Sequence, residues 1–111
     1  MIDDQTRILI SDWYKMKKYI PEYTDQEYTP KFGYVTDYLR EHYGLYVIAK
    51  PSTNSDLDID TPTPQKVYNF RGETAWIKEN YLYKFEVCTH ISYYGAMRDA
   101  INIAIRFLEE N

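Results

Sequence analysis

The chain contains few of the residues from which structural disulfides and membrane spans are built. Cys88 is the single cysteine of 111 residues, so no internal disulfide can form, and a reducing compartment is the simplest expectation. No apolar run approaches the roughly 18 residues of a transmembrane helix. The first residues, Met1-Ile2-Asp3-Asp4, carry negative charge where a signal peptide needs positive charge. We therefore expect a soluble, cytoplasmic protein that does not associate with membranes.

Positive charge and catalytic motifs are scarce as well. Thirteen basic against seventeen acidic side chains give a net charge of −4, which lacks the positive field that supplies non-specific nucleic-acid affinity. The four glycines lie far apart, so the chain has no glycine-rich phosphate loop. Neither a Gly-x-Ser-x-Gly nor a His-Glu-x-x-His motif occurs. We expect a protein without enzymatic activity and without a cofactor.

Tyrosine is the residue in excess. The chain has thirteen tyrosines, and eight of them fall between Tyr14 and Tyr46. A tyrosine combines a large apolar ring with a polar tip, so it serves in a core, on an amphipathic surface or as contact area for a partner. An AT-rich genome would raise the tyrosine content by itself, and composition does not separate these explanations.

The length predicts a single domain, residues 1–111. Its first part, 1–30, is expected to form a helix and a loop. Asp3 or Asp4 can cap this helix, and Pro21 ends it. A short strand over Arg7–Ile10 is the competing interpretation.

Residues 31–111 are expected to form an α+β core that contains a flexible acidic loop, 51–65. A helix capped by Thr29 begins near Pro30 and ends at Gly44, and a strand over 45–50 follows it. The pattern then predicts a strand over 66–70, a turn over 71–73 and a short strand over 74–77.

The clearest strand of the chain is Tyr81–Thr89, in which two sets of side chains alternate. We expect its buried face to carry the more apolar set, Tyr81, Tyr83, Phe85 and Val87. Ser92 caps a final helix from Tyr93 to about Glu110. The predicted fold is therefore α+β: an antiparallel sheet of three to four strands with helices packed on one face. Its α-β-β-β-α core follows an N-terminal helix.

Two groups of residues suggest metal or nucleophile chemistry. Asp56, Asp58 and Asp60 resemble the opening of a calcium loop, but Thr61 and Val67 replace the glycine and the glutamate that such a loop needs. Cys88 and His90 share a strand face and could act as a nucleophile with its base or as two metal ligands. A solvated acidic loop and a small buried cysteine are the commoner explanations.

Lys15, Lys17 and Lys18 form the one basic cluster of the sequence. With the neighbouring tyrosines they could meet phosphates and stack on bases. They complement the dipole at the end of the first helix equally well.

The tyrosines divide by position. Tyr81, Tyr83 and Tyr93 fall on predicted core positions, whereas the remaining candidates lie in the first loop or off the apolar stripes of their helices. Exposed tyrosines gathered on one side indicate a protein interface. The expected binding surface therefore consists of Tyr14, Tyr23, Tyr28, Tyr34 and Tyr38.

Two segments carry a resemblance to a known family. Val35–Leu45, read as V-T-D-Y-L-R-E-H-Y-G-L, is similar to a signature of the form V-x-x-W-L-R-E-x-x-x-I. Tyr93–Ile101 is similar to Y-E-x-A-L-x-x-A-I, with Tyr94 where a glutamate is common and Tyr38 in place of the tryptophan. Together they resemble small uncharacterised proteins of phages and mobile elements in gut Bacteroidetes, a family of unknown function. A protein of this family would act in the host cytoplasm.

The element order of residues 31–110 also resembles the double-stranded-RNA-binding domain. Such domains place basic residues at the start of the last helix, where this chain has Arg98 beside Asp99. Our first hypothesis is therefore a non-catalytic phage-type protein that binds a protein partner, or a second copy of itself, through tyrosine-rich surface. Nucleic-acid binding on a double-stranded-RNA-binding-like scaffold is the alternative.

Overall fold

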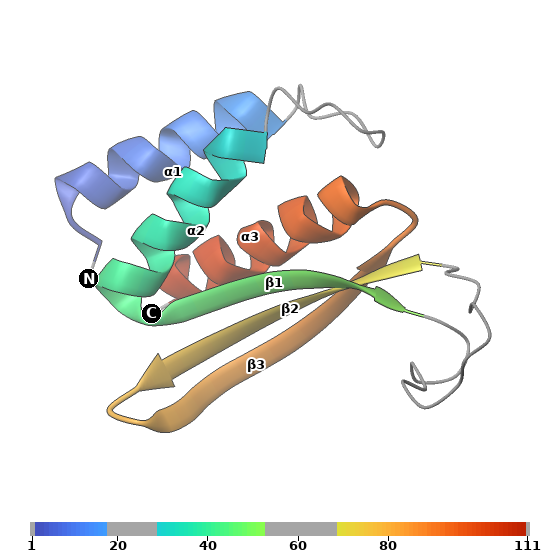
Figure 1. Cartoon of the computed structure of the whole chain (residues 1–111). Coiled ribbons are helices and arrows are strands. Elements are labelled where there is room, and N and C mark those ends of the chain that lie inside the picture. The colour runs from blue at the N-terminus through green and yellow to red at the C-terminus, as the bar shows by residue number, and fades with distance from the viewer. Residues whose placement is uncertain (1, 18–28, 53–68, 111) are drawn as a thin grey trace.

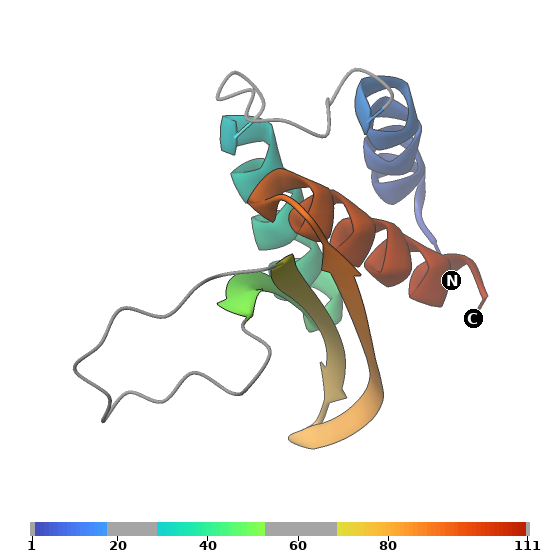
Figure 2. The same cartoon turned by 90° about the vertical axis from the view of Figure 1, so that its right-hand side faces the viewer.

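The computed structural model describes residues 2–17, 29–52 and 69–110, whose elements follow the order α-α-β-β-β-α (Figure 1). Three antiparallel strands form one sheet in the order β1-β2-β3. The helices lie on one side of that sheet (Figures 1 and 2). The predicted α+β class, with an N-terminal helix before the α-β-β-β-α core, is confirmed, and the sheet has three strands within the described residues.

Helix α1, Asp4–Lys17, begins where the sequence predicted. The side chain of Asp3 accepts a hydrogen bond from the Thr6 amide at 2.8 Å, which satisfies one of the free donors of the first turn. Hydrogen bonding from the Thr6 hydroxyl, together with this amide bond, holds the pKa of Asp3 below its ordinary value. The alternative strand over Arg7–Ile10 is wrong, because these residues lie inside the helix.

Helix α2, Thr29–Tyr43, ends at Gly44, as predicted. Gly44 has φ = +71°, a backbone conformation that favours glycine. A Cβ at this position would also collide with the carbonyl oxygen of Ile77. The Gly44 carbonyl in turn accepts a hydrogen bond from the Ile77 amide at 2.9 Å, so the end of α2 is fixed to the sheet.

Strands β1, Leu45–Ser52, β2, Asn69–Lys78, and β3, Tyr81–His90, make up the sheet. The predicted turn over 71–73 is wrong, because β2 runs through it without a break. Gly72 lies in the strand interior for a packing reason: a Cβ there would come within 2.7 Å of the Ala96 carbonyl oxygen of the last helix. The absent side chain lets that helix approach the sheet closely.

A two-residue hairpin joins β2 to β3. Glu79 and Asn80 both have positive φ, 53° and 70°, which is the pattern of a type I′ turn. A register shift between Trp76 and Ile77 inserts one extra residue in β3 at Tyr83.

Helix α3, Tyr93–Glu109, covers the sheet, and Ser92 caps it through a hydrogen bond from the Gly95 amide to the Ser92 hydroxyl at 3.0 Å. Helix α2 flanks β1, and α1 lies outermost against the other two helices (Figures 1 and 2). One apolar cluster joins residues of α1, α2, the sheet and α3, among them Trp13, Leu39, Leu45 and Ile101. The helices therefore share a core with one face of the sheet.

Candidate functional site

The two faces of the sheet differ in what covers them. Thr74 donates a hydrogen bond to the Ala100 carbonyl of α3 at 2.7 Å, and the ring of Trp76 stacks on Phe107 with centroids 6.4 Å apart. Cys88 of β3 lies 3.6 Å from the Ala96 carbonyl oxygen. These residues define the covered face. Because side chains alternate along a strand, their neighbours point away from α3.

The cross-strand register groups the side chains of the opposite face into rows. Tyr46, Ala75 and Phe85 are direct partners across the three strands. The next rows are Ile48 with Glu73 and Val87, then Lys50 with Arg71 and Thr89; at the other end Ile77 pairs with Leu82. We call these eleven residues the open sheet face: Tyr46, Ile48, Lys50, Arg71, Glu73, Ala75, Ile77, Leu82, Phe85, Val87 and Thr89.

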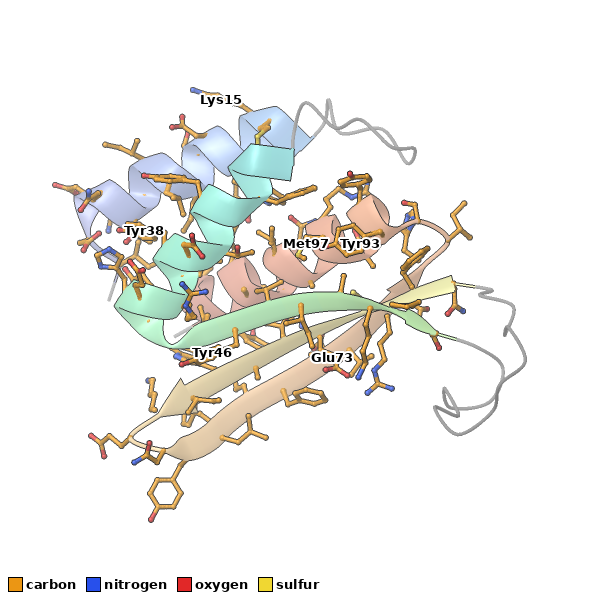
Figure 3. The ribbon with its side chains drawn as sticks, in the orientation of Figure 1. Lys15, Tyr38, Tyr46, Glu73, Tyr93 and Met97 are labelled. Atoms are coloured by element: carbon orange, nitrogen blue, oxygen red, sulfur yellow. The ribbon has the colours of Figure 1, made fainter. Side chains whose placement is uncertain are left out.

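Large apolar side chains of the open sheet face are exposed to solvent. Exposed fractions run from 38% for Ile77 to 61% for Leu82, with Tyr46, Ile48 and Phe85 between them. Figure 3 shows Tyr46 on the side of the sheet opposite Met97 of α3. Within the described ranges no element covers this face. Contiguous exposed apolar surface of this kind marks interaction sites in soluble proteins.

The other end of the open sheet face is charged. Glu73 Oε1 lies 3.2 Å from Lys50 Nζ and 2.9 Å from Arg71 Nε, so two cations share one carboxylate. Glu73 is largely buried by them, while both basic side chains remain exposed for about half of their surface. An excess of one positive charge results at this end. The face is thus apolar in its centre and positive at one rim, which is the anatomy of a protein interface.

The predicted orientation of β3 is wrong. Lys84, Glu86 and Cys88 lie on the covered face, whereas Phe85 and Val87 lie on the open one. Helix α3 reaches β3 with its polar flank: Arg106 pairs with Glu86, and Lys84 lies over the ring of Phe107 at 5.2 Å. Polar side chains therefore suit the rim of the covered face. Tyr81, Tyr83 and Tyr93, predicted as core, are exposed.

The predicted tyrosine surface is only partly brought together. Tyr34 is 65% exposed on α2. Tyr14 is exposed on α1, where its hydroxyl donates to Glu109 of α3 at 2.7 Å; burial of the phenol and this carboxylate raise its pKa to about 12. Tyr23 and Tyr28 lie outside the described residues.

The prediction of an exposed Tyr38 is wrong. Its side chain is 7% exposed, and its hydroxyl lies 2.8 Å from the buried hydroxyl of Thr6, which also contacts the Tyr43 hydroxyl at 2.5 Å. The outward side of α2 is covered because α1 packs against it. The hydroxyl of Tyr38 can be buried between the two helices because it is hydrogen-bonded there. Tyr38 therefore belongs to the α1–α2 contact.

A groove of about 660 Å³ runs between α1 and α2. Apolar side chains line most of it, including Ile8, Met16 and Tyr34, and Tyr38 lies at its base. Residues 18–28, which join these two helices, lie outside the described residues. The groove is a second apolar surface of the molecule, and the one that holds part of the predicted tyrosine set.

The predicted chemical sites find no supporting geometry. Burial and the nearby Asp99 raise the pKa of the Cys88 thiol, which disfavours the thiolate. His90 instead accepts a hydrogen bond from the Ser92 amide at 3.2 Å and lies 3.3 Å from Arg98. Among the residues described, no group of three or more His, Cys, Asp or Glu side chains is placed to hold a metal ion.

The acidic and basic candidates fall largely elsewhere. Asp56, Asp58 and Asp60 lie outside the described ranges, as do Lys18 and the side chain of Lys17. Lys15 is exposed on α1 (Figure 3). At the start of α3, Arg98 pairs with Asp99 at 3.2 Å, so the cation expected at a phosphate contact is already neutralised.

The sequence of β1 contains a signal for the open sheet face that the alternation within β3 does not provide. Strand β1 begins with five apolar residues in a row, 45–49, so both of its faces are apolar. A run of this kind is typical of a strand covered on both sides. Here only Leu45, Val47 and Ala49 meet the core.

In the described part of the chain no helix is long and apolar enough to cross a membrane. A search for similar proteins gave no match: no protein family, no curated protein and no solved structure is significantly similar to this chain.

Proposed function

We propose that this chain is a non-catalytic protein of the phage- or mobile-element type that acts by binding a protein through the open sheet face. The observation that carries the proposal is the exposed row Tyr46, Ala75 and Phe85 with Ile48 and Leu82 beside it. Aromatic and aliphatic side chains at the centre of a patch, with charge at its rim, are what interfaces concentrate.

The family resemblance supports the scaffold and leaves the partner open. In Val35–Leu45 the matching positions Val35, Leu39 and Leu45 are buried in the core. Ala96, Ala100 and Ile101 in the second matching segment are buried as well. Most of the apolar matches are thus core positions, whereas Arg40, Glu41 and Tyr93 match as well and are exposed. None of these three lies on the open sheet face, so the proposed binding role rests on the face and not on the motifs.

Photo-crosslinking tests the proposal. A benzophenone amino acid at Ile48 lies on the open sheet face, and the same group at Tyr34 lies in the α1–α2 groove as a control. In cells that express the chain, we expect a protein adduct from position 48 and none from position 34. Adducts from position 34 alone would transfer the binding role to the groove, and the proposal would fail.

Nucleic-acid binding is the second candidate, and the order α2-β1-β2-β3-α3 favours it. Helices of such a scaffold lie on one side of the sheet, and here they do so as well. The pairing of Arg98 with Asp99 weakens it, because phosphate contacts need free cations. A mobility shift with duplex RNA that weakens as salt rises would favour this candidate; no shift at low salt would remove it.

A further inference from the structure

We infer that the partner of the open sheet face is a second copy of this chain, packed face to face with its strands antiparallel to those of the first. This inference rests on the proposed function, since it names the occupant of the same surface. Two identical subunits related by a two-fold axis bring the same patch together from both sides, so the patch must complement itself.

The apolar rows provide the first part of that complementarity. We place a two-fold axis in the plane between the two sheets, perpendicular to the strands and over the row of Tyr46, Ala75 and Phe85. Each residue of this row then lies opposite the same residue of the other copy. The flanking row of Ile48, Glu73 and Val87 then faces the other copy's pair Ile77 and Leu82. Apolar side chains meet apolar side chains except at Glu73, which lies opposite Ile77 and is paired with Lys50 and Arg71 of its own copy. The two sheets then pack in the aligned manner, about 10 Å apart.

The charges provide the second part. Along β2, Arg71 and Glu79 lie at equal distances in sequence on either side of Ala75. The same axis therefore places the exposed carboxylate of Glu79, in the hairpin turn, over the positive end of the other copy, where Lys50 and Arg71 share Glu73. Each dimer contains this contact twice, and opposite charges at an interface rim fix its register.

The charges also exclude the other symmetric arrangement. A two-fold axis parallel to the strands would pack the faces with all strands running in the same direction. Arg71 of one copy would then meet Arg71 of the other, with both Lys50 side chains at the same level opposite Thr89, and Glu79 would meet Glu79. Like charges brought together at an interface are unfavourable. The charges of the open sheet face therefore favour the antiparallel arrangement.

Analytical ultracentrifugation of the purified chain over about 1 µM to 1 mM tests the inference. We expect a reversible monomer–dimer equilibrium. Phe85→Ser, in the middle row of the face, should weaken dimerisation by roughly tenfold or more, because large aromatic contacts dominate such interfaces. Tyr34→Ser, an exposed aromatic in the α1–α2 groove, is the matched control and should leave the equilibrium unchanged.

A charge-swap series tests the arrangement. Glu79→Lys should weaken the dimer several-fold, and Arg71→Glu combined with Glu79→Lys should restore much of the affinity, since the cross-subunit pair is re-formed with reversed sign. Asp12→Lys on α1 makes the same charge change away from the sheet and should have no effect. A dimer insensitive to Glu79→Lys, or one equally weakened by Asp12→Lys, would overturn the antiparallel arrangement.

Two results would overturn the inference as a whole: a wild-type chain that stays monomeric throughout the concentration range, or a dimer that Phe85→Ser leaves intact. The proposed function is tested separately by the crosslinks from position 48. A monomer that still gives an adduct with a different protein from this position retains the proposed function and loses the second-copy inference. A monomer that gives no adduct there loses both.

Discussion

The two faces of the sheet are built from the same three strands yet differ in what holds them. On the covered face, Trp76 stacks on Phe107, its indole nitrogen donates to the Tyr43 carbonyl at 2.8 Å, and Gly72 makes room for α3. On the open sheet face, residues one position away keep much of their apolar surface in water. A buried side chain stabilises the fold; an exposed apolar one adds little to it. Residues of the open sheet face can therefore suit a binding partner at little cost to the stability of the fold.

The largest expected difference between the faces is in aromatic truncation. Trp76→Ala removes a buried ring and its hydrogen bond to Tyr43, and should lower the free energy of unfolding by about 3–5 kcal/mol. Phe85→Ala truncates an exposed ring on the other face and should cost no more than about 1 kcal/mol. Urea unfolding at low protein concentration measures both. Equal losses would break the distinction between the faces.

Enlarging a small side chain compares the two faces at two positions of β2. Gly72→Val should destabilise by about 1–3 kcal/mol, because a Cβ there meets Cys88 Sγ at 2.6 Å and the Ala96 carbonyl oxygen at 2.7 Å. Ala75→Val points to the open side and should be neutral or slightly stabilising, since β-branched residues suit strands. Thermal unfolding of the two variants decides the matter; a destabilised Ala75→Val would show that this face is already packed.

Two threonines provide a polar version of the same test. Thr74→Val removes the hydroxyl that donates to the Ala100 carbonyl of α3, in addition to that carbonyl's own helix bond, and should cost about 0.5–1.5 kcal/mol. Thr89→Val on the open sheet face should stay within about 0.5 kcal/mol of the wild type. Urea midpoints compare them. If Thr74→Val proved neutral, the hydrogen bond from β2 to α3 would contribute nothing net.

The smallest expected difference between the two faces is in the reactivity of a cysteine thiol, which can be measured with high sensitivity. Burial and Asp99 raise the pKa of Cys88 above its ordinary value of 9.0, so its thiolate fraction at neutral pH is lowered. Its reaction with a disulfide reagent should be slow at pH 7 and should accelerate through a midpoint above 9.0. Val87→Cys in a Cys88→Ser background, on the open side, should react faster at pH 7. A fast Cys88 would contradict its placement against α3.

Local sequence signals predicted the elements better than they predicted the faces. The Asp3 and Ser92 caps and the Gly44 terminus depend on backbone geometry within a few residues, and all three are confirmed. The orientation of β3 depends on which flank of α3 lies above it. Nothing within 81–89 specifies that flank.

The candidate site shows the same limit. Tyr34 is exposed as predicted, whereas Tyr38 is buried because α1 packs on α2 and offers the Thr6 hydroxyl. That contact joins residues 32 positions apart, beyond the reach of helical periodicity. The open sheet face gathers residues from three strands, and only the cross-strand register shows that they are neighbours.

The measurement that tests the central claim most directly is hydroxyl-radical footprinting of the open sheet face. The chain is labelled as a dilute purified protein and again at high concentration in an extract of the cells that express it, and oxidation is quantified residue by residue. We expect Tyr46, Leu82 and Phe85 to react readily when dilute and to be protected several-fold in the extract, with Tyr34 equally reactive in both. Equal oxidation of Phe85 under the two conditions would contradict the claim that this face binds a protein.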